Sequence, residues 1–513
     1  MKNYSRIKKS VVNVKFALTF FVINIVLQFF YRKVFLDVLG SDILGLNTTA
    51  MNLLQFLNLA ELGVGAAVSY SLYKPLNNNN QKQVNEIVSI QGYLYSRIGM
   101  VVLIAAIILM LFFPFFFSDI KISLWYAYTT FGVLLVSALI GYFLNYQQIV
   151  LVSDQKEYKL NYAIQGTKII KVVLQILTIY FLDNGYIWWL FWELMAIFVT
   201  VFGIKYILDI EYPWLDTNIH LGKKLMIKYP DITHKTKQLI THKIAGFALN
   251  ESSPLIIFAF TSLSFVASYG NYLLIILGIT ALLGAVFNST NAGVGNLVSE
   301  GNLDKIISVF KELFALRFFL SCIACYGVYK LTPVFVVHWV GKQYLLEKSN
   351  LILLVLIMFI NVTRLTVDSF INAYGLFNDI AAPIIETFLN IGLSILLGYF
   401  FGINGILVGV LCSLCLIVLF WKPFFLFKSG FKFDFIQYFI MYSKLLTTTA
   451  FTFCLTEYLI SKIKIDPYLS LYNFIIYSFI IIFIFFILLL IGFLSIDNGM
   501  RQLYLRCKLY LTK

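Results

Sequence analysis

Long apolar stretches separated by short polar connections run through almost the whole chain. A helix needs about 20 apolar residues to cross about 30 Å of hydrocarbon, and each stretch is close to that length. The pattern therefore predicts an all-α polytopic membrane protein with about 14 transmembrane helices. The expected spans are 12–31, 46–72, 89–117, 123–152, 163–182, 186–208, 239–265, 271–298, 307–331, 350–372, 381–400, 403–427, 437–460 and 470–496.

Composition supports this interpretation and excludes a soluble globular protein. Hydrophobic residues make up 60% of the 513 residues and charged residues only 12%, whereas a soluble domain usually has about 25% charged residues. The formal net charge is +14. In a soluble protein such a charge would favour nucleic acid as a partner, but in a membrane protein Lys and Arg gather in cytoplasmic connections. We therefore expect no nucleic-acid partner.

The distribution of basic residues predicts the orientation of the chain. If the N-terminus is cytoplasmic, the even-numbered connections are cytoplasmic too, and these connections together with the two basic termini hold most of the Lys and Arg residues. The longest connection, near 209–238, is one of them and is strongly basic. Positive residues stay on the cytoplasmic side, so both termini are expected there.

Two segments in different halves of the chain are nearly alike, ELGVGAAVS at 61–69 and NAGVGNLVS at 291–299. EIVSI at 86–90 and KIISV at 305–309 extend the similarity. Halves of six spans share one orientation, which predicts two parallel six-helix lobes followed by two extra helices. The expected domains are an N-terminal lobe at 1–209, a cytoplasmic linker at 210–238, a C-terminal lobe at 239–436, and the extra helices with a basic tail at 437–513.

Amide side chains are frequent in spans one, two, seven and eight. Amides that face lipid are costly, so we expect them to face protein or water. For any one of them the alternative is a hydrogen bond between helices. Enrichment at matching positions of both halves favours a shared polar cavity. The expected cavity amides are Asn24, Gln28, Asn52, Gln55, Asn58, Asn250, Asn288 and Asn291.

Charged side chains inside spans are a sharper signal, because each costs at least about 2.5 kcal/mol at mid-membrane unless it is paired or hydrated. Arg97 and Arg317 are the strongest candidates for substrate binding, since each half supplies one. Arg32 and Lys33, at the end of span one, are further candidate cations. A guanidinium or an ammonium group in these positions would suit an anionic substrate.

Acidic residues in the spans are candidates for ion coupling. Glu61 and Glu251 are the two that we single out, because a carboxylate in a low-dielectric site can titrate near neutral pH. Movement of a proton or a cation through either residue could then drive a conformational change.

Four further intramembrane charges have structural explanations. Arg364 and Asp368 are four residues apart on one expected helix and should form an ion pair. Lys168 and Lys171 are expected to extend towards the cytoplasmic interface.

Signatures of enzymes and metal sites are missing from the sequence, which has no P-loop and no His-Glu-x-x-His motif. The pairs Cys322/Cys325 and Cys412/Cys415 lie in apolar spans without histidine nearby, so they are expected to be small core residues. A membrane enzyme such as a repeat-unit polymerase or ligase would carry a large external loop, but the longest one expected here, 332–349, is short. We expect no cofactor, no metal and no enzymatic activity.

Four segments resemble the Wzx-type oligosaccharide flippases, a branch of the multidrug/oligosaccharidyl-lipid/polysaccharide exporter superfamily. They are LAELGVGAAVSYSLYKPL at 59–76, HKIAGFALN at 242–250, GNLVSEGN at 295–302 and PIIETFLNIGLS at 383–394. The resemblance covers spans one to twelve. It departs at 251–254, where ESSP replaces a small polar run with an aspartate. It implies alternating access between two lobes around a central cavity lined largely by spans one, two, seven and eight.

The resemblance also implies a substrate, undecaprenyl-pyrophosphate carrying an oligosaccharide repeat unit. The lipid would cross the bacterial inner membrane for O-antigen, capsule or exopolysaccharide assembly. The implied partners are membrane lipids, H+ or Na+ as coupling ion, and other polysaccharide-assembly proteins. The alternatives are a drug or cation exporter of the same superfamily and a lipid II flippase. A cation exporter needs an acidic, aromatic cavity, whereas the candidate positions named above hold four basic residues and two acidic ones.

Overall fold

The computed structural model describes residues 2–58, 64–117, 122–232, 236, 253–288, 290–376, 379 and 381–511. Helices dominate these residues, which contain no β-strand. Nine helical segments within the described ranges are long and apolar enough to cross a membrane. The predicted all-α polytopic membrane fold is therefore confirmed. The chain forms two compact units, Met1–Ala267 and Ser268–Lys513, and each is considered by itself; the lobe and linker boundaries drawn from the sequence remain predictions.

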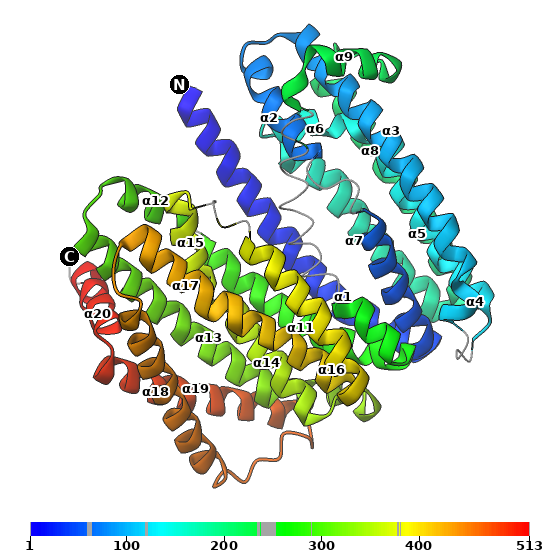
Figure 1. Ribbon diagram of the computed structural model, residues 1–513. Helices are drawn as coiled ribbons and strands as arrows, with labels where there is room; N and C mark the ends of the chain where they lie inside the picture. The colour runs from blue at the N-terminus through cyan, green and yellow to red at the C-terminus, as the bar shows by residue number, and fades with distance from the viewer. Residues whose placement is uncertain are drawn as a thin grey trace. The chain divides into compact units, whose positions relative to one another are not determined.

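Long helices running side by side form the first unit (Figure 1). Helix α7 packs against both α1 and α8, and α5 packs against α1, α3 and α8. A buried core of aliphatic and aromatic side chains, including Leu72, Val88 and Phe131, holds them together. The helices are α1 (Lys2–Leu57), α2 (Val64–Asn77), α3 (Gln81–Leu111), α4 (Phe113–Phe116), α5 (Leu124–Leu144), α6 (Ile149–Ser153), α7 (Glu157–Phe181), α8 (Gly185–Glu211) and α9 (Gly222–Lys228), and residues 253–260 are also helical.

A sharp break at Gly40 divides α1 into two helices. Gly40 has φ 84° and ψ 170°, a conformation that glycine adopts without a steric penalty because it lacks a Cβ atom. The helix that follows starts at Ser41, so spans one and two are joined by a bend rather than by the loop expected between them.

The second unit contains most of α11 (Leu263–Asn288), which begins in the first unit. A cluster of stacked and edge-on phenylalanine rings forms its core, with Phe310 and Phe370 at a centroid distance of 5.2 Å. The other helices are α12 (Asn291–Ser299), α13 (Leu303–Trp339), α14 (Lys348–Thr363), α15 (Leu365–Tyr374), α16 (Ala381–Ser413), α17 (Lys422–Phe425), α18 (Ile436–Ile460), α19 (Leu471–Ile496) and α20 (Asn498–Leu511).

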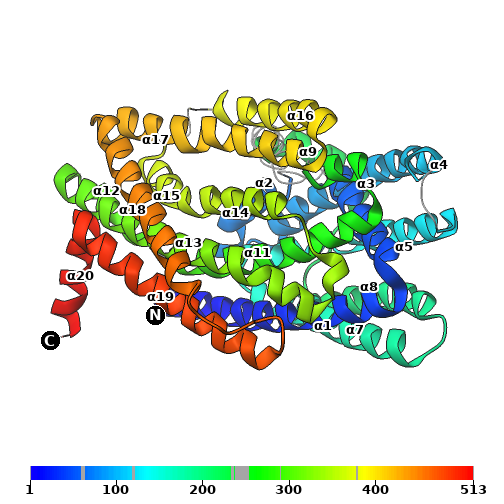
Figure 2. The ribbon, with the colours of Figure 1, turned by 90° about the horizontal axis from the view of Figure 1, so that it is seen from below.

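Two features of the second unit bear on the predicted spans. Gly402 breaks α16 with φ 57° and ψ −137°, at the point where the sequence predicts the end of one span and the start of the next. The last pair of spans, α18 and α19, packs on α13 (Figure 2). Phe493 of α19 lies 5.8 Å from Phe319 of α13 between ring centroids, so these extra helices share the core of this unit.

Candidate functional site

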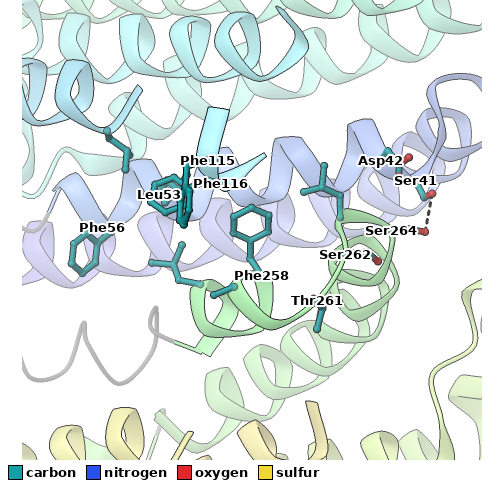
Figure 3. A pocket seen from close by; sticks show the side chains of 14 residues that line it. Ser41, Asp42, Leu53, Phe56, Phe115, Phe116, Phe258, Thr261, Ser262 and Ser264 are labelled. Atoms are coloured by element: carbon teal, nitrogen blue, oxygen red, sulfur yellow. Dashed lines mark hydrogen bonds between the residues drawn. The ribbon is translucent and has the colours of Figure 1, made fainter. Parts of the chain in front are cut away.

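The first unit contains a pocket of about 1050 Å³. Its wall comes from the second half of α1, the end of α3, α4 and residues 255–264. The two ends of the pocket differ in chemistry (Figure 3). Hydroxyl groups and one carboxylate lie at one end, and leucine and phenylalanine side chains line the rest. The polar residues are Ser41, Asp42, Thr261, Ser262 and Ser264, and the aromatic residues are Phe56, Phe115, Phe116 and Phe258.

Two helix starts create the polar end. The Gly40 break lets a new helix begin at Ser41, and Ser262 precedes α11, where its Oγ accepts a hydrogen bond from the backbone N–H of Phe265 at 3.2 Å. Ser264 Oγ donates to Ser41 Oγ at 3.0 Å and so connects the two starts. Serine is favoured in such positions because its hydroxyl satisfies backbone donors of the first turn.

Asp42 is the one charged side chain on the pocket wall in the part of the chain that the structure describes. It is half-buried. A carboxylate beside hydroxyl groups can accept hydrogen bonds from sugar hydroxyls or attract an organic cation. Phenyl faces can pack against the C–H face of a sugar ring, or against a cation. A phosphate group is disfavoured at this end, because it would meet a like charge.

Arg317 is the centre of a second polar cluster, in the second unit. Only 1% of the residue is exposed. Nη1 donates to Ser369 Oγ at 3.2 Å, and Nη2 donates to the Phe287 carbonyl at 3.1 Å and to Thr290 Oγ1 at 2.8 Å. Ser369 in turn donates to Asn291 Oδ1 at 2.8 Å. The predicted site residues Arg317 and Asn291 thus meet through a hydroxyl group that the sequence had not singled out.

No carboxylate within the described ranges forms an ion pair with Arg317. The guanidinium carbon lies 5.1 Å from the centre of the Phe287 ring, so a cation–π contact adds to the hydrogen bonds. Asn288, another predicted cavity amide, is exposed, and its Oδ1 accepts a hydrogen bond from Asn291 Nδ2 at 3.4 Å.

Arg97 differs from Arg317, its counterpart in the sequence repeat. It is exposed on α3, and its guanidinium carbon lies 5.4 Å from the centre of the Tyr93 ring. The structure gives Arg97 no ion pair with any described acid. An exposed arginine within a span must meet water, a lipid head group or a bound anion, since hydrocarbon would be costly.

The two cations predicted at the end of span one lie on α1. Arg32 is half-buried, and its Nη2 donates to the carbonyl of Ala267 at 3.1 Å. Lys33 is exposed and forms an ion pair with Asp37, one turn further along, at 3.3 Å. The charge of Lys33 is therefore partly compensated within its own helix.

The predicted cavity amides of the first unit differ in their hydrogen bonds and in their exposure. Asn24 Nδ2 donates to Gln165 Oε1 on α7 at 3.1 Å, and Asn58 Oδ1 accepts from the Tyr142 hydroxyl at 3.0 Å. Gln28 and Asn52 are half-buried and Gln55 is exposed. Three predicted positions lie outside the described residues, namely Glu61, Asn250 and Glu251.

The expected structural charges also have defined partners. Arg364 Nε and Asp368 Oδ2 are 2.9 Å apart, which confirms the predicted ion pair, and Lys422 lies 3.4 Å from the same carboxylate. Lys171 instead forms an ion pair with Glu193 of α8 at 2.8 Å. Its predicted extension to the interface is wrong, because α7 and α8 place a carboxylate within its reach.

Sequence reasoning missed the pocket of the first unit. Its polar end could have been found, because Gly40-Ser-Asp42 is a typical start of a helix. The phenylalanines carry no such signal, since phenylalanine is common throughout the chain, which has 50 of them. Only the fold brings the phenylalanines of α1, α4 and residues 255–264 to the wall of one pocket.

No protein-family model matches this chain, and no curated protein matches its sequence. Its fold is similar to that of the lipid II flippase MurJ in an inward closed conformation, with a TM-score of 0.67, 14% identity, and 94% of this chain and 98% of that chain covered. It is also similar to an inward-facing multidrug resistance MATE family transporter of the MOP superfamily, with a TM-score of 0.56, 15% identity, and 80% and 95% covered. The chain therefore shares the fold of these two transporters, while the superfamily and Wzx-type assignments remain predictions.

Proposed function

We propose that this protein is a flippase for undecaprenyl-pyrophosphate-linked oligosaccharides. It would move these lipids from the cytoplasmic to the outer leaflet of a bacterial inner membrane by alternating access, with both termini in the cytoplasm. The fold supports a transporter of this superfamily, because its structural neighbours are named as a lipid II flippase and a multidrug resistance transporter. The proposal involves no enzymatic step and no cofactor.

One observation carries the choice of an anionic substrate. Neither Arg97 nor Arg317 forms an ion pair with a described carboxylate. Arg97 is exposed and can contact an anion directly. Arg317 is buried among neutral hydrogen-bond acceptors, so its proposed contribution is its positive charge and not a direct contact. Uncompensated cations in a membrane are costly unless they meet water or an anion. A pyrophosphate offers several oxygens for charge-assisted hydrogen bonds with guanidinium groups. Arg32 and Lys33 are proposed to add to this positive field.

The oligosaccharide part of the substrate would need neutral donors and acceptors. The amides Asn52 and Gln55 of α1, and Asn58 directly after it, are proposed to provide some of them. The pocket of the first unit provides hydroxyl groups and a carboxylate next to phenylalanine rings, a combination that suits the polar edge and the apolar face of a sugar. The prenyl chain would remain in the lipid bilayer, where its burial from water is most favourable.

Transport against a gradient requires coupling to an energy source. Glu61 and Glu251 are proposed to carry H+ or Na+ during the cycle, since a ligand can shift a conformational equilibrium only if it binds the two states differently. Flipping in proteoliposomes, measured with and without imposed pH and sodium gradients, tests this coupling. A flipping rate that is unchanged by either gradient contradicts the proposed coupling.

A second candidate function is export of organic cations. The pocket of the first unit favours it, because its described wall combines Asp42 with four phenylalanines and no basic residue. An acid attracts a cation, and phenyl faces add cation–π attraction. The positive charge of Arg97 and Arg317 opposes this candidate.

Complementation tests the proposed function most directly. The chain is expressed in a bacterial strain that lacks its own repeat-unit flippase, and surface glycan is measured. Restored glycan supports the proposal. In parallel, purified protein in liposomes is given a fluorescent lipid-linked oligosaccharide, purified lipid II or tetraphenylphosphonium. Movement of tetraphenylphosphonium alone would favour the exporter, and movement of lipid II alone would favour the lipid II alternative.

A further inference from the structure

Lys168 lies deep inside the span formed by α7, far from the polar end of that helix. The polar end is marked by a cluster in which Lys156 and Lys159 both form ion pairs with Glu211. Lys168 comes nine residues after Lys159, which corresponds to a rise of about 14 Å along a helix. In a hydrocarbon layer about 30 Å thick this position is close to the middle. A side chain of four methylene groups cannot bring its ammonium group back to the interface from there.

Lys171, in the same helix, has a carboxylate that neutralises its charge. Lys171 Nζ donates to both carboxylate oxygens of Glu193, at 2.8 and 2.9 Å. Gln175 Nε2 donates to the same carboxylate at 3.1 Å. Glu193 is therefore already occupied by two donors. Lys168 is exposed and forms no ion pair with any acid in the described part of the chain.

Lys168, Lys171 and Glu193 interact electrostatically with one another. Two cations and one anion leave one net positive charge. Because Lys171 is paired with Glu193, this charge is on the exposed Lys168. An exposed cation at mid-membrane is costly unless it faces a hydrated cavity or an anionic ligand. Lys168 is therefore better suited to binding an anionic ligand than to a structural role in an ion pair.

Amide side chains lie along the contact between α1 and α7, at positions close to Lys168 in the sequence of helical turns. Phe20 and Tyr162 lie at a ring centroid distance of 5.9 Å, and one turn further Asn24 donates to Gln165 at 3.1 Å. Helices α1 and α7 are therefore parallel here, and successive turns of one face successive turns of the other. The next turn of α1 carries Gln28 and the next turn of α7 carries Lys168. Gln165 and Lys168 share a helix face because they are three residues apart.

We propose that Lys168 binds the pyrophosphate of the lipid-linked substrate, with Gln165 and Gln28 as neutral donors beside it. This inference rests on the proposed function and adds a cation that the sequence had assigned to the membrane interface. A lysine suits a mobile substrate, because its ammonium is a compact charge on a flexible stem and can follow the anion through small displacements. Amides next to it can donate to the remaining phosphate oxygens.

Binding of farnesyl diphosphate to the purified full-length protein tests this assignment, with farnesol as the uncharged probe. In Lys168→Gln the diphosphate affinity is expected to fall about tenfold, the effect of losing one charge-assisted hydrogen bond. Farnesol affinity should not change, and Lys168→Arg should keep most of the diphosphate affinity. The matched control is Lys305→Gln, because Lys305 is an exposed lysine paired with Glu300 at 2.6 Å.

Chemical restoration of the charge separates a binding role from a folding role. Lys168→Cys is treated with aminoethyl methanethiosulfonate, which restores an ammonium group, or with methyl methanethiosulfonate, which does not. Diphosphate binding should recover only with the aminoethyl reagent. Wild-type protein, whose exposed Cys454 can also react, should keep the same diphosphate affinity with either reagent. Equal binding after both reagents would overturn the assignment of Lys168.

Transport assays distinguish this inference from the proposed function. If wild-type protein and Lys168→Gln flip a fluorescent lipid-linked oligosaccharide at the same rate and bind farnesyl diphosphate equally well, the role of Lys168 is excluded and the flippase proposal stands. If wild-type protein neither moves this lipid nor restores surface glycan, the proposed function itself fails.

Discussion

Arg317 of α13 donates a hydrogen bond to Ser369 of α15 at 3.2 Å, in the interior of the second unit. The same guanidinium also binds the Phe287 carbonyl and the Thr290 hydroxyl. One arginine thus connects α11, α13 and α15 by polar contacts. Its repeat counterpart, Arg97, is exposed, so equivalent positions of the two halves perform different tasks.

Replacement of Arg317 should reduce both stability and transport. Arg317→Ala removes the donor of three hydrogen bonds, to Ser369, the Phe287 carbonyl and Thr290, and a hydrogen bond to a charged group contributes about 1.5–3 kcal/mol. We expect a clearly lower melting temperature in detergent together with loss of surface glycan in the complementation assay. A variant that melts like wild-type protein would contradict the structural role of this cluster.

Replacement of Arg97 should reduce transport without reducing stability. Because the side chain is exposed and its only described contact is with the Tyr93 ring, Arg97→Ala should change the free energy of unfolding by no more than about 0.5 kcal/mol. Transport of the lipid-linked oligosaccharide should nevertheless fall. Wild-type glycan display in both arginine variants would count against a cationic substrate site.

Gly45 should tolerate no side chain, since a Cβ atom there would lie 2.0 Å from the carbonyl oxygen of Leu263. Gly45→Ala would force apart the two helix starts at the polar end of the pocket and lower the melting temperature. Gly132→Ala is the matched control, because Gly132 lies in α5 with open space at the Cβ position. The control should be neutral or stabilising by up to about 1 kcal/mol, the difference in helix propensity.

Asp42 distinguishes the two candidate functions. If the pocket binds organic cations, Asp42→Asn should abolish tetraphenylphosphonium transport, because the attracting charge is lost. In a glycolipid flippase the amide still accepts hydrogen bonds from sugar hydroxyls, so glycan display should fall only modestly. Asp379→Asn serves as a control at an aspartate that does not line this pocket. Complete loss of glycan display with unchanged protein levels would show that the carboxylate itself is needed by the flippase.

Much of the fold could be predicted because it depends on local properties of the chain. Every expected span overlaps a described helix, although only residues 253–265 of the span 239–265 are described. Hydrophobic length is sufficient for this, since a backbone in hydrocarbon must satisfy its own hydrogen bonds. The ion pair between Arg364 and Asp368 could be predicted equally well, because the two residues lie one helical turn apart.

Contacts between distant segments could not be predicted in the same way. The partner of Lys171 is 22 residues away on the next helix, and Ser369 is 52 residues from Arg317. Such pairs depend on helix rotation and register, which hydropathy does not specify. The pocket of the first unit likewise depends on residues 255–264 meeting α1 and α4.

The amino-acid sequence alone determined the membrane class, the approximate positions of the spans and the set of intramembrane charges. Those properties follow from hydrophobic length and from the cost of charge in lipid, which act at each position independently. Only the tertiary structure decided which of these charges are neutralised. Glu193 pairs with Lys171 rather than with Lys168, and no described carboxylate reaches Arg317. Neutralisation requires two groups within a few ångströms, and that distance is a property of helix packing.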